Sequence, residues 1–235
     1  MAAMRIAKAL AQSGIAARRK CDELILKGKV TVNGTVVTQP QTVVDPKNDA
    51  IAVHGKPIAV EKKLYYIMNK PKGFECSHKK VPGKQIVYSL FSEIGARLFS
   101  VGRLDKETTG LLIFTNDGDF ANRIIHPSAN ITKEYLLKAH RDITHDDLVT
   151  IGQGIEIDGV HVRPTKVKKV RKTTLKIAVK EGKKHEVRKL AAAADLKVLE
   201  LTRLRIGNLQ LGNLPEGMFR ALTEKERLLA EPAST

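Results

Sequence analysis

The spacing of apolar and polar residues predicts a small unit of two helices and a hairpin at the start of the chain. Apolar positions one helical turn apart predict a first helix that ends at Ser13-Gly14 and a second helix over residues 16–27. Residues 30–37 then alternate as a pair of β-strands would, around Asn33-Gly34. Both residues of that dipeptide tolerate the positive φ of a type I′ turn, so we expect a β-hairpin here.

Short apolar strands dominate from residue 64 onward, and helices are interspersed among them. The pattern predicts strands near 64–68, 98–101, 111–114, 133–139, 162–172, 175–179 and 197–211, and helices near 84–94, 117–126, 144–151 and 185–194. Residues 55–63 combine glycine, proline and charge, as linkers do. We therefore expect an α+β chain with a first domain at 1–60, a larger domain at 64–228 and a disordered tail at 229–235.

The charge balance predicts a polyanionic partner. Lys and Arg outnumber Asp and Glu 41 to 25, which gives a net charge of +16 over 235 residues. The positive excess is spread along the whole chain rather than gathered in one tail, so a broad surface for nucleic acid is favoured. The alternative is a solvated basic surface without a specific partner. Charge does not separate RNA from DNA.

Several classes of protein find no support in the sequence. The two cysteines, Cys21 and Cys76, form no C-x-x-C pair, and the histidines are scattered, so we expect neither disulfides nor a metal site. No G-x-G-x-x-G or G-K-[ST] motif indicates a nucleotide cofactor. Neither a signal peptide nor a run of about 20 apolar residues is present, so we expect a cytoplasmic protein without a membrane partner.

Three segments contain candidate site residues. Asp105 lies beside Arg103 in a tight segment between two glycines, where a basic surrounding favours a charged carboxylate that could act as a nucleophile. Tyr135 begins a strand, and Arg188 lies in the first turn of a predicted helix. A cation gains nothing from the helix dipole there, so we expect an anionic partner, Asp105.

Each of these residues also has an ordinary interpretation. Asp105 could be a turn carboxylate, Tyr135 a half-buried strand residue and Arg188 an exposed helix residue. Together, however, they supply a carboxylate, a stacking ring and a counter-cation in a basic protein. That combination is suited to holding a flipped pyrimidine against a nucleophile.

The first 60 residues resemble the S4-type RNA-binding module. The matching residues are Ile6, Leu10, Gly14, Ala17-Arg18-Arg19, Leu24-Ile25, Gly28-Lys29-Val30, Val32-Asn33-Gly34 and Val43. The resemblance implies two helices against a small sheet that binds structured RNA. The candidate phosphate contacts are Arg5, Arg18, Arg19, Lys20 and Lys27. For the triplet 18–20 the alternative is a solvated helix end.

Residues 64–226 resemble the RsuA-like family of ribosomal RNA pseudouridine synthases. The matching segments are Gly102-Arg-Leu-Asp-x-x-Thr-x-Gly110 with Leu111-Leu112, Thr115-Asn-Asp-Gly118, Lys133-x-Tyr135, Glu181-Gly-x-x-x-x-Val-Arg188, Ile206-Gly207, Leu214, Gly217 and Arg220. The resemblance implies a synthase domain built on a mostly antiparallel mixed sheet with flanking helices. It also implies that a uridine is isomerised without cofactor or metal.

The resemblance assigns roles by position. Asp105 is the essential carboxylate, and whether it attacks C1′, attacks the base or removes the 2′ proton stays open. Tyr135 would stack on the target base and could serve as a base. Arg188 would pair with Asp105 and keep it ionised and oriented. Arg103 would help to displace the uridine from its helix.

The partner implied is ribosomal RNA or a ribosome-assembly intermediate, bound by a monomer. Large-subunit 23S RNA is favoured over small-subunit 16S RNA, although the motifs are shared. One departure is Lys189-Leu190, where the family has arginine and methionine, so a point charge replaces a bidentate fork beside Arg188. The alternatives to an enzyme are an RNA-binding assembly factor without chemistry and an RNA chaperone that acts through charge.

Overall fold

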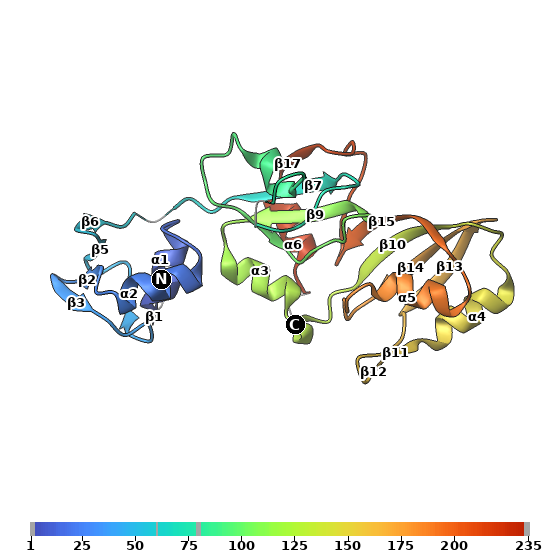
Figure 1. The fold of residues 1–235 in the computed structure, drawn as a ribbon, viewed down its shortest axis with the longest axis horizontal. Helices are drawn as coiled ribbons and strands as arrows, with labels where there is room; N and C mark the ends of the chain where they lie inside the picture. Colours follow the sequence, from blue (N-terminus) through green and yellow to red (C-terminus); the bar gives the residue numbers. More distant parts are fainter. Residues whose placement is uncertain (1–2, 60, 79–80, 233–235) are drawn as a thin grey trace. The chain divides into compact units, whose positions relative to one another are not determined.

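The computed structural model describes residues 3–59, 61–78 and 81–232 (Figure 1). The chain divides into two compact units, one formed by residues 1–63 with 116–118 and the other by residues 64–115 with 119–235. Each unit has a hydrophobic core of its own. Within the described ranges, no helix is both long and apolar enough to span a membrane.

The first unit contains the predicted helices and hairpin. Its elements are β1 (Met4–Arg5), α1 (Ile6–Gln12), α2 (Arg18–Leu26), β2 (Val30–Val32), β3 (Thr35–Val37), β4 (Val43–Val44), β5 (Ile51–Val53) and β6 (Lys56–Pro57). The sheet order is β3-β2-β5-β6, and β1 pairs with β4. Asn33 and Gly34 have φ values of 51° and 83°, which confirms the predicted turn. Apolar residues from both helices pack on the sheet and form the core.

The second unit is larger and holds the remaining elements. These are β7 (Tyr65–Lys70), η1 (Val87–Phe91), β8 (Phe99–Val101), β9 (Thr109–Thr115), α3 (Gly118–Ile125), η2 (Pro127–Ala129), β10 (Lys133–Ala139), α4 (His145–Gln153), β11 (Ile155–Ile157), β12 (Val160–Val162), β13 (Lys166–Arg171), β14 (Thr174–Val179), α5 (Glu186–Ala193), β15 (Val198–Ile206), β16 (Leu209–Gln210), β17 (Phe219–Ala221) and α6 (Glu224–Ala230). Strands in the order β13-β14-β10-β15-β9-β7-β17 form the path of a nine-stranded sheet, with β16 on β15 and β8 on β9. Pairing is antiparallel except between β15 and β9. The predicted mostly antiparallel mixed sheet is confirmed.

Helices α4 and α5 cover one face of the sheet at its β13–β15 end (Figure 1). Strand β10 shows the alternation that causes this, because Tyr135, Leu137 and Ala139 face the core cluster that α5 completes. Glu134 and Lys138 belong to the opposite face, where Glu134 pairs with basic residues and Lys138 with an exposed glutamate. The central strands β10, β15 and β9 therefore place their covered face next to the loops that follow β8 and β14.

The segment predicted as a helix at 84–94 forms only the short 3-10 turn η1. The backbone at the start of this segment pairs with an upstream residue instead of forming a helix. Glu75 and Ile86 form a β-bridge, and the Val87 N–H donates to the Glu75 carbonyl (3.0 Å). Ile86 is extended, with φ −110° and ψ 136°, so the helical turn begins only at Val87 and ends at Phe91. The helix prediction was wrong for this segment.

Two predictions near the C-terminus also change. The strand predicted over 197–211 is a hairpin, β15 and β16, that turns at Gly207-Asn208. The start predicted for a disordered tail, residue 229, is too early. Helix α6 extends through Ala230, whose side chain is fully buried. Thr223 and Glu226 form a capping box that supports this helix. Residues 233–235 lie outside the described part of the chain.

Candidate active site

The loop between β8 and β9 presents Asp105, and a buried lysine holds that loop in place. Strands β8 and β9 pair with each other, so residues 102–108 must return over a short distance. Lys70, at the end of β7, is fully buried beneath the loop. Its ammonium group donates to three backbone carbonyls, those of Pro71 (2.9 Å), Lys106 (3.3 Å) and Thr108 (2.9 Å). Burial lowers the pKa of Lys70, and the three acceptors satisfy its donors.

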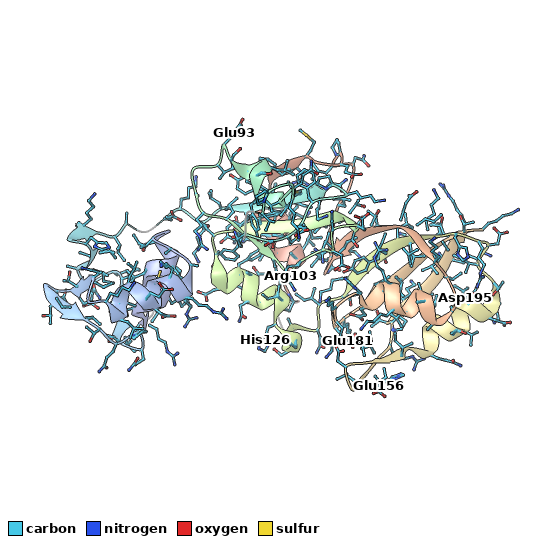
Figure 2. All side chains as sticks on the ribbon, viewed as in Figure 1. Glu93, Arg103, His126, Glu156, Glu181 and Asp195 are labelled. Carbon is cyan, nitrogen blue, oxygen red and sulfur yellow. The ribbon has the colours of Figure 1, made fainter. Side chains whose placement is uncertain are left out.

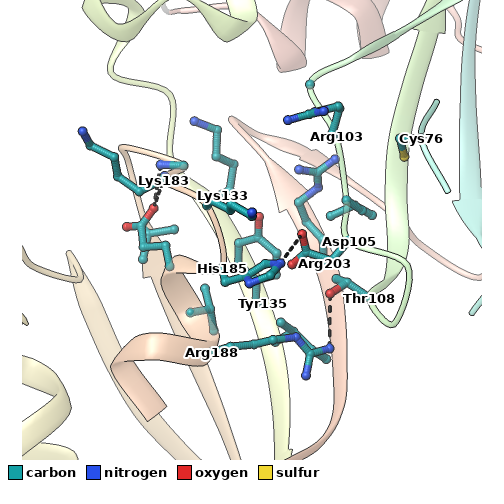
Figure 3. Close-up of a pocket in the computed structure, with 18 of the residues that line it drawn as sticks. Cys76, Arg103, Asp105, Thr108, Lys133, Tyr135, Lys183, His185, Arg188 and Arg203 are labelled. Carbon is teal, nitrogen blue, oxygen red and sulfur yellow. Dashed lines mark hydrogen bonds and ion pairs between the residues drawn. The ribbon is translucent and has the colours of Figure 1, made fainter. Parts of the chain in front are cut away.

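The side chains predicted from three separate segments line one cavity of about 850 Å³. Arg103 and Asp105 come from the loop, Tyr135 from β10 and Arg188 from α5 (Figure 3). Figure 2 labels two of the lining residues, Arg103 and Glu181, within the second unit. Lys and Arg outnumber Asp and Glu seven to four among the lining residues. An anionic ligand is therefore favoured in this cavity.

Asp105 interacts with a histidine rather than with the predicted arginine. His185 Nε2 lies 3.2 Å from Asp105 Oδ1, and the two side chains are 46% and 39% exposed. Arg188 makes no ion pair with Asp105 in the described part of the chain. Its guanidinium instead donates to the Glu107 carbonyl (3.1 Å) and the Thr108 hydroxyl (3.4 Å). The expected Arg188–Asp105 pair was wrong, because the third residue of α5 faces the C-terminal half of the loop.

His185 occupies a strained position in front of α5. It is the N-cap residue of that helix, with φ 56° and ψ 23°, in the left-handed region that residues other than glycine seldom adopt. The conformation lets the side chain reach Asp105 although its neighbours continue into the helix. The sequence contains a signal for this residue, since His185 lies inside the motif that ends in Arg188.

Tyr135 lies half-buried at a bulge in the sheet. Its Cα pairs with Ile177 on β14 and Arg203 on β15, and the register of β10 against β15 shifts between Glu134 and Tyr135. The ring packs against two core clusters and also lines the cavity. It is therefore placed where a planar base could stack on it.

Two buried charged residues in the cavity wall were not predicted. Arg203 on β15 and Glu186 in the first turn of α5 each have a buried side-chain atom without a hydrogen-bond partner, Nη2 and Oε1 respectively. Glu186 Oε2 accepts from the backbone N–H groups of Gly182 (2.6 Å) and Lys183 (2.9 Å), and burial raises the pKa of its carboxyl group. Charged side chains are seldom buried, so nothing in the residue types alone marks these two positions.

The five residues predicted to bind RNA in the first unit are all exposed. They are Arg5, Arg18, Arg19, Lys20 and Lys27. The triplet 18–20 forms the first turn of α2, where backbone N–H groups add to the attraction for anions. Lys20 pairs with Glu23 at 2.6 Å, so its charge is partly neutralised. These positions remain candidates for phosphate contacts.

Comparison with known proteins gives one consistent family. Residues 64–193 match the model of the RNA pseudouridylate synthases, and residues 4–51 match the S4 domain. An uncharacterized RNA pseudouridine synthase of Aquifex aeolicus is 40% identical over 231 residues, covering 96% of this chain and 93% of that protein. The ribosomal large subunit pseudouridine synthase B of Bacillus subtilis is 35% identical over 228 residues, covering 94% and 93%.

Two further similarities concern a longer relative and a solved structure. A chloroplastic protein of Arabidopsis thaliana, named as a candidate ribosomal large subunit pseudouridine synthase, is 43% identical over 88% of this chain, which spans only 55% of that relative. A crystal structure of a pseudouridylate synthase superposes with a TM-score of 0.70 at 28% identity, covering 97% of this chain and 99% of the other. The chain therefore belongs to the RNA pseudouridylate synthase family, as an RNA pseudouridine synthase of the RsuA-like group with an S4 domain ahead of its synthase domain.

Proposed function

We propose that the chain converts a uridine of large-subunit ribosomal RNA to pseudouridine, with Asp105 as the catalytic carboxylate acting on a flipped-out nucleotide. One observation carries the proposal. Asp105 projects, 39% exposed, from a loop tied to a buried lysine into a cationic cavity of about 850 Å³. A space of that size accommodates a nucleoside together with a phosphate.

The reaction needs no partner beyond the RNA. The N1–C1′ bond breaks, the base turns, and a C5–C1′ bond forms. The proton on C5 leaves to a base or to water, and N1 gains a proton, so atoms and electrons balance without a cofactor. Whether Asp105 attacks C1′, attacks the base or removes the 2′ proton, each route requires a negatively charged carboxylate.

The neighbouring residues take supporting roles in this proposal. Tyr135 stacks on the flipped base, and Arg103, exposed on the same loop, occupies the gap that the uridine leaves in its helix. His185 orients Asp105 through the 3.2 Å contact. Arg188 holds the 107–108 backbone, and through it the loop, rather than the carboxylate itself.

The substrate class is inferred from relatives and from the first unit. The printed names of the Bacillus and Arabidopsis relatives refer to the large ribosomal subunit. The S4 domain supplies an independent grip on structured RNA through Arg5, Arg18, Arg19, Lys20 and Lys27. The bacterial relatives favour the cytoplasm as the compartment, since ribosomes are assembled there.

The test replaces Asp105 by Asn and maps pseudouridine in both ribosomal RNAs of cells that carry the wild type, the variant or no copy of the protein. Loss of one site in large-subunit RNA, with RNA binding retained, is the expected result. Glu107→Gln is the matched control, because it removes an exposed carboxylate from the same loop. Modification that persists in Asp105→Asn would overturn the catalytic assignment, and a lost site in small-subunit RNA would overturn the substrate.

A further inference from the structure

We propose that the guanidinium of Arg203 binds a carbonyl oxygen of the target uracil and stabilises the negative charge that builds up on the base. Arg203 is only 4% exposed, yet it lines the cavity that contains Asp105. Its single hydrogen bond within the described chain runs from Nε to the Leu111 carbonyl (2.8 Å). Nη2 is buried without any partner.

A buried guanidinium with an empty donor is costly unless a ligand completes it. The nearby acid does not do so, because Asp105 contacts His185 and no ion pair of Arg203 occurs in the described part of the chain. Lys133 adds a second cation rather than a counter-charge, and burial together with the charge of Arg203 lowers the pKa of Lys133. Both cations and Tyr135 surround one space in Figure 3, which therefore selects an electron-rich group.

The depth of Arg203 favours the base over a phosphate. Exposed cations on the same cavity, Arg103, Lys106 and Lys184, are available to the RNA backbone, which stays close to solvent. A flipped base enters further. Stacked on Tyr135, whose Cα pairs with that of Arg203, a uracil would present its O2 or O4 to the buried donor.

The chemistry gives this contact a catalytic effect, and here the inference rests on the proposed function. When the N1–C1′ bond breaks, its electron pair stays with the base, and the charge spreads over N1, O2 and O4. Addition of a nucleophile to the ring likewise moves charge onto a carbonyl oxygen. In every route the hydrogen bond from Arg203 strengthens in the transition state, so it accelerates the reaction rather than only binding substrate.

The backbone holds Arg203 in position beforehand. Gly110 of β9 has φ +104°, and a Cβ there would lie 2.6 Å from Arg203 N and closer still to its carbonyl oxygen. The absent side chain lets the parallel strands β9 and β15 approach at this point. With Nε fixed on Leu111, little reorganisation is needed when substrate arrives.

The test pairs enzyme variants with modified substrates. Full-length wild type, Arg203→Lys and Arg203→Met react with a synthetic RNA stem-loop that spans the uridine found by mapping. The target is uridine, 2-thiouridine, 4-thiouridine or uridine with a neighbouring methylphosphonate. We expect a loss in kcat of about 100-fold in both variants, with RNA affinity changed less than about threefold. We also expect one thio substitution to slow the wild type but not the variants, because sulfur is the weaker acceptor.

The outcomes separate the possible explanations. If methylphosphonate, rather than a thio substitution, slows the wild type but not the variants, Arg203 binds phosphate and the proposal is wrong. If the variants are active and each substrate modification slows them as much as it slows the wild type, Arg203 has only a structural role and the proposal is also wrong. The thio effect on the wild type does not depend on the folding of a variant, and near-ultraviolet circular dichroism checks that folding. A wild type that modifies no ribosomal RNA overturns the proposed function, and the inference with it.

Discussion

Replacing Asp147 by Asn should destabilise the synthase unit, and the loss should disappear in acid. Asp147 forms the capping box of α4 with Thr144 and accepts two hydrogen bonds from Arg141, at 2.7 and 3.0 Å. Arg141 also donates to the Ala194 carbonyl at the end of α5 (3.0 Å). Through Arg141, the carboxylate therefore ties α4 to the end of α5, the helix that lines the cavity.

The magnitude follows from the pKa of the carboxyl group, which Arg141 lowers from 3.8 to about 2. At about 1.4 kcal/mol per unit, this shift corresponds to roughly 2–3 kcal/mol of stability. Asp147 is 10% exposed but Arg141 is 35% exposed, so solvent screens part of the interaction and leaves about 1–2 kcal/mol. A lowered pKa stabilises the fold fully above the unfolded value, and the contribution is lost as the pH falls through about 2. About half remains near pH 3.

Urea unfolding measured by near-ultraviolet circular dichroism tests this prediction. The chain has no tryptophan and 4 tyrosines, all of them in the synthase unit, so the signal reports that unit alone. Glu226→Gln is the control, because Arg220 likewise lowers the pKa of Glu226, from 4.5 to about 2. That shift is the larger of the two, but the pair is more exposed, at 24% and 44%, so solvent screens more of the interaction. We expect a smaller loss there. A change below about 0.5 kcal/mol for Asp147→Asn at pH 7, or an undiminished change at pH 3, would refute the reasoning.

Three further predictions concern other parts of the chain. Gly110→Ala should lower the melting temperature by more than about 5 °C in calorimetry, because a side chain at φ +104° collides with the backbone of β15, whereas Gly95→Ala, in open space, should change little. Glu186→Gln should gain stability relative to wild type as the pH rises from about 4 to 7, because burial raises the pKa of Glu186 and so the ionised form weakens the native state. A difference that stays flat with pH would contradict this. Arg18→Ala with Arg19→Ala should reduce the salt dependence of RNA binding by up to about two units of slope and leave kcat at saturating RNA unchanged. An unchanged slope would remove these arginines from the RNA interface.

Local patterns predicted much of the fold because local physics decides those features. The Asn33-Gly34 turn has the predicted positive φ values, and the alternation in β10 places Tyr135 and Leu137 on the covered face. The helix predicted at 84–94 failed because Ile86 forms an isolated β-bridge with Glu75, which lies outside the predicted segment. That competition depends on tertiary pairing, which no local window contains.

The candidate site was predictable as a set of segments but not as a set of contacts. The position of Arg188 in the first turn of α5 was predicted, and so was its need for an acceptor. Which acceptor it meets depends on how α5 packs on the loop, and backbone and hydroxyl oxygens take the place expected for Asp105. For Arg203 a usable signal existed, since it shares a face of β15 with the buried Leu201. Arginine is seldom buried, however, so this alternation alone does not distinguish a buried Arg203 from an exposed one.

Four cations of the site and its supporting loop are held differently from Arg141 and Arg220 of the same unit. Arg141 and Arg220 are neutralised by bidentate carboxylates, Asp147 and Glu226. Four cations of the site and its supporting loop are instead held by neutral oxygens and make no ion pair in the described part of the chain: Lys70, Lys133, Arg188 and Arg203. A carbonyl or hydroxyl fixes the position of a cation but leaves its charge uncompensated. The positive field in the cavity therefore remains available to a carboxylate, to phosphates and to a base that becomes an anion during the reaction.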